Sequence, residues 1–297
     1  SIPDYTGYDE TVNPTISNLF ATSAYRVGHT MLSSQILRLD SQGNEIQAGH
    51  LDLADAFFKP ETIENEGIAP ILRGLATQGA QDVDAFVIGD VRNFLFGPPG
   101  SGGMDLVSLN IQRGREHGIP SYNDMREAFG RNRAEDFSDI NPDPDVHQKL
   151  DSAYDNVDQI DAWVGLLSEP HAQGAFVGET LRRIFTDQFV RLRDGDRFWY
   201  ESYLSQDMID EVESMTLAEV IRANTSIDGE IQDDVFLTNG GVCFGDCDGS
   251  GEVDFNDIVT MLSAFGTDAS AECDADQSGE VDFNDLLVAL FMFGECP

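Results

Sequence analysis

The chain is poor in cysteine. All four cysteines, Cys243, Cys247, Cys273 and Cys296, lie in the last 55 of its 297 residues, and residues 1 to 242 contain none. An even number of cysteines in a short segment is typical of a small unit stapled by disulfides in an oxidising, secreted setting. The uneven distribution predicts an extracellular protein with two units, residues 1–240 and 241–297.

Basic residues are also scarce. The chain has 54 Asp and Glu against 17 Lys and Arg, a formal net charge of −37, and its last 55 residues hold 13 acids and no base. Such a surface repels phosphate backbones and anionic lipids, so no nucleic-acid or membrane-surface partner is expected. No apolar run is long enough to span a bilayer, which predicts no membrane span. Cations are the natural partners of this composition.

The apolar residues of the larger unit follow a helical period, and no alternating strand pattern stands out. The pattern predicts helices over residues 16–37, 71–78, 82–96, 122–129, 160–167, 175–193 and 217–224. Runs rich in Pro and Gly at 97–103 and 141–145 interrupt it. The expected fold class is therefore mainly α.

The smaller unit contains an internal repeat, in which DCDGSGEVDFNDIV at 246–259 matches DADQSGEVDFNDLL 28 residues later. Both copies fit the twelve-residue calcium loop, with a glycine, Gly251 or Gly279, at its sharp turn. Carboxylates this close together repel one another unless a divalent cation neutralises them. The pattern predicts two Ca²⁺ ions, held by Asp246, Asp248, Ser250, the Glu252 carbonyl, Asp254 and Asp257, and by Asp274, Asp276, Ser278, the Glu280 carbonyl, Asp282 and Asp285.

An apolar stripe follows each loop and predicts one helix per loop. The stripes are Ile258, Val259, Leu262 and Phe265, and Leu286, Leu287, Leu290 and Phe293. This small α unit resembles a type I dockerin, or a dockerin-like EF-hand pair, and the resemblance implies a protein partner. The pairs before the last ligand are Phe255-Asn256 and Phe283-Asn284 rather than the hydroxyl or basic pairs usual in that family, which argues against a cohesin. The alternative, a disordered acidic tail, is disfavoured by the doubled match.

Two of the cysteines bracket this unit. We expect Cys243 to pair with Cys296, clasping its ends, and Cys247 to pair with Cys273. Four cysteines allow three connectivities, and the sequence does not choose among them. A zinc site built from all four thiolates is the alternative.

Two motifs of the larger unit are specific. The segments AYRVGHT at 24–30 and SLNIQRGREHGIPSYNDMREAFG at 108–130 resemble the animal haem peroxidases, and weaker matches follow in the family's order at 71–78, 91–96, 161–170 and 192–201. The resemblance covers residues 10 to 240. It implies a partial domain of the helical animal-haem-peroxidase type, its C-terminal, proximal portion.

The resemblance also implies the residues of a haem b site. His29 would be the proximal ligand of the iron, and Asn110 would accept a hydrogen bond from the other ring nitrogen, which makes these two the catalytic pair. Arg113, and Arg26 one turn before His29, would pair with the haem propionates, because a guanidinium fork matches a carboxylate. Alone, His29 would more often be a core histidine, but the motifs occur together and in order.

In the family, a distal His and Arg that act on peroxide lie upstream of the proximal helix, as do the carboxylates that can link haem covalently. None of the five histidines here lies in the distal motif. The sequence therefore predicts one part of a haem peroxidase, inactive by itself, although a naturally reduced protein is the alternative. The whole enzyme would reduce hydrogen peroxide and oxidise a halide or small organic donor, as in the response to oxidative stress.

Two other functions are alternatives to a peroxidase. A fatty-acid dioxygenase places a radical-forming tyrosine three residues before the proximal histidine, and here that position is Arg26. A non-catalytic binding or matrix module, anchored by its calcium tail, is the other alternative.

Overall fold

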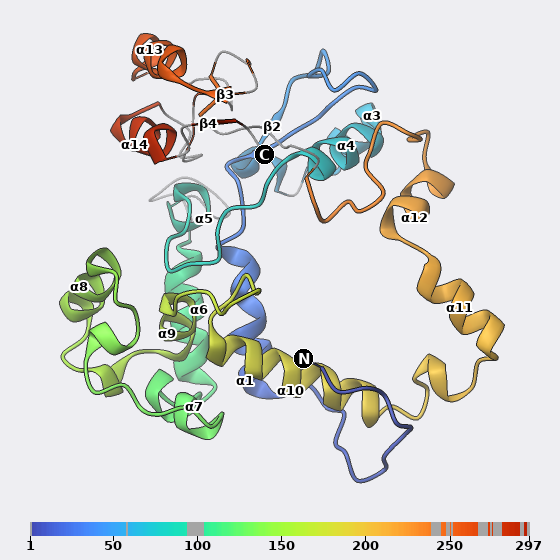
Figure 1. Ribbon diagram of the computed structural model, residues 1–297, viewed down its shortest axis with the longest axis vertical. Coiled ribbons are helices and arrows are strands. Elements are labelled where there is room, and N and C mark those ends of the chain that lie inside the picture. Colours follow the sequence, from blue (N-terminus) through green and yellow to red (C-terminus); the bar gives the residue numbers. More distant parts are fainter. Residues whose placement is uncertain are drawn as a thin grey trace.

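The computed structural model describes residues 2–57, 59–93 and 104–238, and in the tail residues 245–247, 250, 252–266, 273, 275, 281–291 and 294–295. The expected mainly helical fold is confirmed (Figure 1). Strands in the described residues are two short antiparallel pairs, β1 (Gln35–Ile36) with β2 (Leu51–Asp52) and β3 (Glu252–Val253) with β4 (Gly294–Glu295).

Helices make up most of the larger unit. In chain order they are α1 (Asn18–Thr22), the 3₁₀ helix η1 (Ala24–His29), α2 (Leu53–Ala56), α3 (Glu61–Glu66), α4 (Ala69–Thr77), α5 (Gly89–Asn93), α6 (Leu106–Glu116), α7 (Tyr122–Ala128), α8 (Pro144–Ala153), α9 (Ala162–Ser168), α10 (Glu179–Asp194), α11 (Gln206–Ser214) and α12 (Leu217–Asn224), with 3₁₀ turns at Phe137–Asp139, Val157–Gln159 and Tyr200–Ser202. The helices predicted at 71–78, 122–129, 160–167 and 217–224 are confirmed as α4, α7, α9 and α12. Helices α2, α3, α6, α8 and α11 were not predicted.

Three predicted helices are wrong in extent. The one expected over 16–37 is α1, then a break at Ser23, then η1, and the chain is extended at Gln35–Ile36. A second helix was expected over 82–96, but residues 82–88 are not helical. The side chain of Asp82 accepts the backbone N–H of Val83, and such a bond competes with the hydrogen bonds of a helix. Helix α10 begins four residues late, after Gly178.

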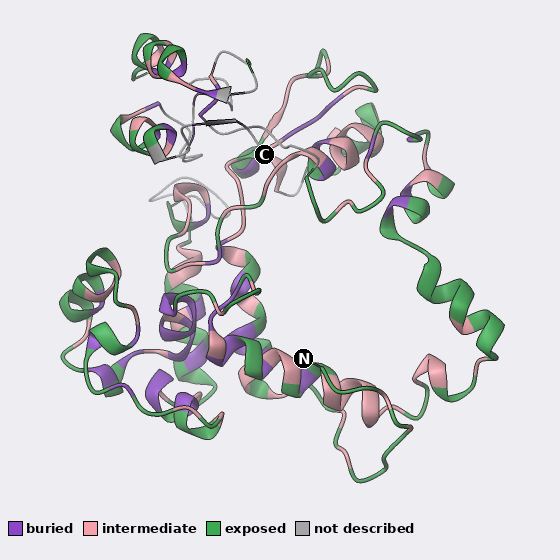
Figure 2. Ribbon diagram, viewed as in Figure 1, coloured by how far each residue is buried: buried purple, intermediate pink, exposed green. Residues whose placement is uncertain are grey.

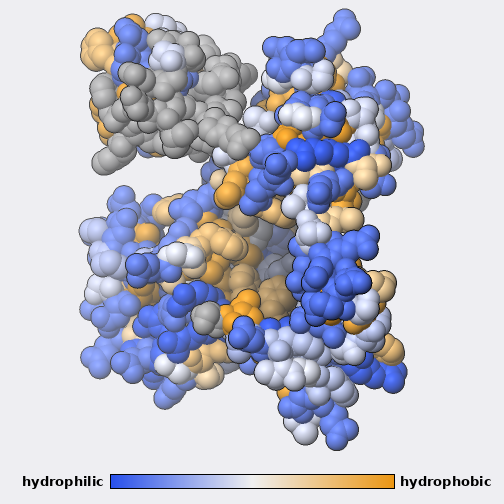
Figure 3. Space-filling model, turned by 45° about the vertical axis from the view of Figure 1, so that its right-hand side comes forward, coloured by the Kyte–Doolittle hydropathy of each residue, from blue (hydrophilic) through white to orange (hydrophobic). Residues whose placement is uncertain are grey.

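The main core lies where α1, η1, α7, α9 and the start of α10 meet (Figure 2). Its largest fully buried side chains include Tyr122, Met125, Ile160, Leu166 and Leu181. By contrast, α11 has no buried residue. The outer surface is largely hydrophilic, with apolar surface gathered around a hollow in the middle of the face shown in Figure 3.

The close approach of α7 and α9 depends on Gly165. A Cβ at this position would overlap the ring of Tyr122, which is fully buried and cannot move aside. We expect Gly165→Ala to lower the free energy of unfolding by about 1–3 kcal/mol through overpacking, measured by urea denaturation. Gly229→Ala is the matched control, because a Cβ there meets nothing within 4 Å. Equal stability of the two variants would contradict this account of the α7–α9 contact.

Helices α11 and α12 form an arc that returns the chain from α10 to α4 (Figure 1). A small second core joins α12 and the segment after it to α4, and contains Ala76, Ala218, Ile221, Ile227 and Ile231. Beside it, Arg73 forms an ion pair of 2.9 Å with Glu230. Among the described residues, no helix is both long enough and apolar enough to cross a membrane.

The tail contains α13 (Phe255–Ala264) and α14 (Phe283–Phe291), and the predicted disulfide between Cys247 and Cys273 is present. The predicted pair Cys243 and Cys296 lies outside the described residues. The core of the tail consists of Val253, Met261, Cys273, Ala275, Val281 and Ala289, with Ile258 and Leu286 packed against it.

The predicted stripes of the tail are therefore only partly correct. Val259, Leu262, Phe265, Leu287 and Leu290 are exposed, and Phe293 lies outside the described residues. The core contains Met261 and Ala289 instead, and Ala264 packs against it. The two helices therefore contact each other through small or flexible side chains.

Candidate functional site

The motif AYRVGH folds as the 3₁₀ helix η1. In a 3₁₀ helix, side chains three residues apart eclipse one another, so Arg26 lies directly over His29. The preceding helix α1 is capped by Ser17, whose Oγ accepts the N–H of Phe20 at 3.2 Å. Ser17 is itself tied to α10, because its own N–H donates to Oε1 of Gln188 at 2.8 Å. These bonds hold the helix that presents His29 against the main core.

The motif LNIQRGRE forms α6. Asp105 caps its start by accepting the N–H groups of Val107 and Ser108, at 2.9 and 3.3 Å. Gly118, with φ of +65°, ends it in the left-handed conformation, which costs glycine little. Asn110 lies in the middle of this well-defined helix and is fully buried.

The structure brings His29 and Asn110 together. Nδ2 of Asn110 lies 2.8 Å from Nδ1 of His29, and Oδ1 of Asn110 accepts from Nη1 of Arg26 at 3.0 Å. An amide N–H donates, so this orientation leaves the imidazole proton on Nε2. The reverse amide orientation occupies the same volume, and would let Oδ1 accept a proton carried on Nδ1. Either state of the pair is therefore available without movement of the helices.

His29 is half-buried, and its environment favours the neutral ring. Burial lowers its pKa, the positive charge of Arg26 lowers it further, and the hydrogen bond with Asn110 opposes these effects. Burial, followed by the like charge of Arg113, also lowers the pKa of Arg26. A neutral imidazole has the lone pair that a metal ion requires.

The two arginines beside His29 have the chemistry of an anion site. Among the described residues, neither Arg26 nor Arg113 forms an ion pair, in a chain with a large excess of acids. Nε of Arg26 is buried and, within the same part of the chain, has no hydrogen-bond partner. Two adjacent cations, one with an orphaned buried donor, fit the paired carboxylates of haem.

Sequence reasoning missed Trp163 of α9. Its side chain is buried, and its indole N–H donates to the carbonyl oxygen of Arg26 at 3.3 Å, so α9 also positions η1. The tryptophan lies in the segment 161–170, but a bond from a side chain to a backbone carbonyl leaves no residue pattern that would have pointed to it.

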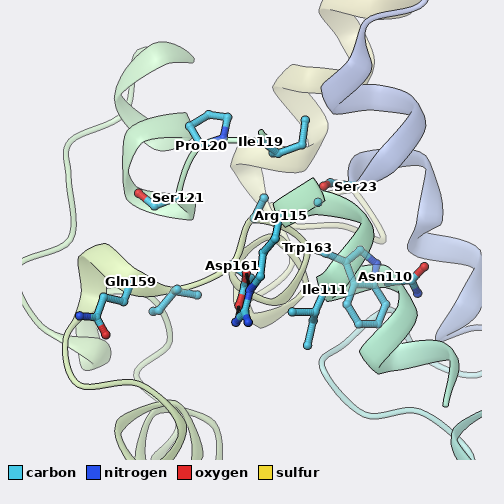
Figure 4. A pocket seen from close by; sticks show the side chains of 13 residues that line it. Ser23, Asn110, Ile111, Arg115, Ile119, Pro120, Ser121, Gln159, Asp161 and Trp163 are labelled. Carbon is cyan, nitrogen blue, oxygen red and sulfur yellow. Dashed lines mark hydrogen bonds and ion pairs between the residues drawn. The ribbon is translucent and has the colours of Figure 1, made fainter. Parts of the chain in front are cut away.

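A cavity of about 170 Å³ lies beside Asn110 (Figure 4). Asn110 and Trp163 line one end of it, and Arg115 reaches across to Asp161. The guanidinium of Arg115 contacts both carboxylate oxygens of Asp161, at 2.8 and 2.7 Å. This bidentate pair ties α6 to the start of α9, so we assign Arg115 a structural role.

The calcium loops are described in part. Asp248, Asp274, Asp276, Ser278 and Glu280 lie outside the described residues, as does the side chain of Glu252. Within the described part, no group of three or more His, Cys, Asp or Glu side chains is placed to hold a metal ion.

The last two acidic positions of the two loops have the same geometry. Asp257 and Asp285 are fully buried, and each accepts the N–H of the acid three residues before it, Asp254 or Asp282, at 2.6 Å. In the first loop, Oδ1 of Asp246 accepts the N–H of Ser250 at 2.8 Å. The two copies of the repeat thus fold alike at these positions.

A mainly helical fold that holds a neutral histidine against an amide and two arginines has the chemistry expected of a haem protein. The chain belongs to the animal haem peroxidase family, whose model, described as "Animal haem peroxidase", matches residues 1–236. The match ends four residues before the boundary predicted at residue 240. Members of this family bind haem.

The relatives include a peroxidase with a solved structure. Peroxinectin A of Dictyostelium discoideum is 43% identical over 236 residues, which are 80% of this chain and 44% of that protein. The human peroxidasin homolog is 37% identical over 244 residues, 80% of this chain and 16% of that protein. The solved structure of peroxidase A from Dictyostelium discoideum is 43% identical, with a TM-score of 0.74 over 79% of this chain and 45% of that one.

The fold is shared more widely than the activity. A fatty acid alpha-dioxygenase from Arabidopsis thaliana superposes with a TM-score of 0.64 over 75% of this chain, but it is only 22% identical. That likeness shows the fold alone. The chain spans less than half the length of peroxinectin A and of peroxidase A.

Proposed function

We propose that this chain supplies the proximal side of a haem peroxidase and carries a calcium-binding tail. The observation that carries the proposal is the contact between His29 and Asn110, 81 residues apart in sequence, beside Arg26. Haem bound there would supply the redox chemistry by which hydrogen peroxide is reduced and a halide or small organic donor is oxidised.

The residues of the chain would act as follows. With the proton on Nδ1, His29 presents the lone pair of Nε2 to the iron, and the amide oxygen of Asn110 accepts that proton and fixes the ring. In this amide orientation Nη1 of Arg26 loses its acceptor, so Arg26 becomes available to a propionate, together with Arg113. The buried indole of Trp163 holds the backbone of Arg26 in place.

The groups that act directly on peroxide would lie on the distal side of the haem. Peroxide cleavage needs a group that moves a proton between the two oxygens and a cation that stabilises the developing charge. None of the histidines of this chain lies in the distal motif, and the match covers 44% of peroxinectin A, so in this proposal the distal groups belong to the part of the family's length that the chain does not cover. Whether haem is covalently attached would be decided there too.

The peroxidase is favoured over a lipid dioxygenase by a specific residue. Arg26 occupies the position of the dioxygenase tyrosine, and it points its guanidinium at Asn110 rather than offering an oxidisable phenol. Tyr25, the neighbouring tyrosine, is 62% exposed and stacks on Phe20, with ring centroids 4.8 Å apart.

The tail, in this proposal, binds two Ca²⁺ ions and docks onto a protein partner outside the cell. Support for calcium comes from the doubled twelve-residue pattern, and from the buried carboxylates of Asp257 and Asp285 at the last position of each loop. Support for a partner comes from apolar side chains exposed at matching positions of the repeat. They are Phe255, Val259 and Leu262 on α13 and Phe283, Leu287 and Leu290 on α14.

The activity is tested by comparing two proteins after reconstitution with haemin: the chain alone, and a longer product of the same gene that includes the residues before Ser1. Both are expected to bind haem, whereas only the longer protein should oxidise guaiacol or iodide at the expense of hydrogen peroxide. A longer protein that binds haem and has no more peroxide-dependent activity than free haemin would favour the non-catalytic matrix module instead.

A further inference from the structure

A second cavity, of about 260 Å³, lies between α6, α8, α9 and the segment at Phe86. Its walls are apolar and include the buried Leu150, Trp163 and Leu167 and the half-buried Val107 and Ile111. An apolar cavity of about 150 Å³ is enough to hold one benzene ring. This cavity therefore has room for a one-ring or small two-ring molecule.

The neutral polar groups of its lining are already used. The hydroxyl of Tyr154 donates to Asp161 at 2.9 Å, and the indole N–H of Trp163 donates to the Arg26 carbonyl. Oγ of Ser168 donates to the carbonyl oxygen of Val164 at 2.8 Å. A ligand would therefore contact apolar surface, and these three residues would offer it no free hydrogen-bond donor.

Lys149 is the exception. It is the charged residue in the lining, its Nζ lies 4.3 Å from the centroid of the exposed Phe86 ring, and it forms no ion pair with any described residue. The whole chain has only two lysines, the other being Lys59. A cation at the rim of an apolar cavity matches a flat hydrophobic molecule with an anionic end.

The carboxylate of Asp84 is influenced by the charge of Lys149. Burial raises its pKa, while the positive charges of His171 and Lys149 act in the opposite direction. Oδ1 of Asp84 is also held by the N–H of Phe86 at 2.7 Å. Asp84 offsets part of the Lys149 charge without pairing with it.

We propose that this cavity binds a small aromatic carboxylate, with its ring between α6, α8 and α9 and its carboxylate on Lys149. The site is separate from the His29 and Asn110 pair, and it shares Trp163 with the support of η1. A long alkyl chain would extend beyond the apolar walls of the cavity, and a cation would be repelled by Lys149. The proposal does not depend on haem.

The test uses 4-fluorobenzoate as the probe and the full chain without haem, with binding followed by ¹⁹F NMR. Saturable binding is expected, weakened about tenfold by Lys149→Gln, because a hydrogen bond to a charged group is lost. Lys59→Gln is the matched control and should bind as the wild type does. Asp84→Asn should tighten binding, and 4-fluorobenzyl alcohol, which has no charge, should not distinguish Lys149→Gln from the wild type.

A second variant tests the cavity itself. Ala153 lines the cavity and is exposed near the end of α8, so Ala153→Phe should fill the space without loss of folding, as checked by circular dichroism, and should abolish binding. No saturable binding by the wild type, or binding that is unchanged in both Lys149→Gln and Ala153→Phe, would overturn the assignment. Since haem is absent, neither result bears on the proposed peroxidase function.

Discussion

Replacing His29 with alanine is expected to abolish the Soret band that develops when haemin is titrated into the chain. The neutral half-buried imidazole is the proposed protein ligand of the iron, and nothing else in the His29 and Asn110 pair can donate a lone pair of that kind. Asn110→Ala should have a graded effect, about 10- to 100-fold weaker haemin binding, because the ring loses the partner that fixes its orientation. Absorbance titration with limiting haemin measures both.

The matched control for this titration is His117→Ala. His117 belongs to the motif that contains Asn110. It is exposed at the end of α6, and its Nδ1 lies 3.0 Å from Oδ1 of Asn18, which is a structural contact. Its loss should leave the Soret band in place. Identical spectra for the wild type and His29→Ala would remove the iron-ligand assignment, and with it the proposed peroxidase.

Removing calcium is expected to destabilise the tail while leaving the larger unit folded. If free Ca²⁺ is 100 times its dissociation constant, each site contributes about 2.7 kcal/mol to stability, and chelation by EGTA removes that contribution. Asp257 and Asp285, buried at the last position of each loop, would then lose the cation that the proposal places beside them. Thermal unfolding monitored by calorimetry should show one transition that moves to lower temperature with EGTA and another that does not.

Single-site variants separate the two calcium loops. Asp257→Asn keeps an oxygen that can accept the N–H of Asp254 but removes the charge, so calorimetric titration should show one of two sites weakened. Asp285→Asn should do the same in the second loop, and Glu211→Gln on the exposed α11 should change neither. Two intact sites in both Asp→Asn variants would contradict the loop interpretation.

The sequence predicted the members of the candidate site, but only through its resemblance to a family. Periodicity places His29 on a predicted helix but predicts none at Asn110, and it gives no reason for the two residues to meet across 81 positions of sequence. Trp163 could not be predicted, because it acts on a backbone carbonyl. The predicted helices were wrong where a side chain competes for backbone hydrogen bonds, as at Asp82. They were correct where the apolar periodicity is uninterrupted, as in α12.

The tail shows a different limit. The repeat predicted two helices, and the structure contains both. The expected disulfide of Cys247 and Cys273 is also present, although the sequence left three connectivities open. The pattern could not tell which apolar face is buried, because both faces of α13 carry apolar residues. Met261 is fully buried, whereas Leu262, next to it in sequence, is 55% exposed.

The arc from α10 to α4 is closed by contacts between distant parts of the chain, such as the one between Arg73 and Glu230, 157 residues apart. The entropy lost in closing such a loop grows only with the logarithm of its length, by about 0.6 kcal/mol for each doubling. Lengthening the connections on either side of α11 by a few residues would therefore hardly weaken the closure. The ion pair of Arg73 and Glu230 is therefore expected to survive insertions there.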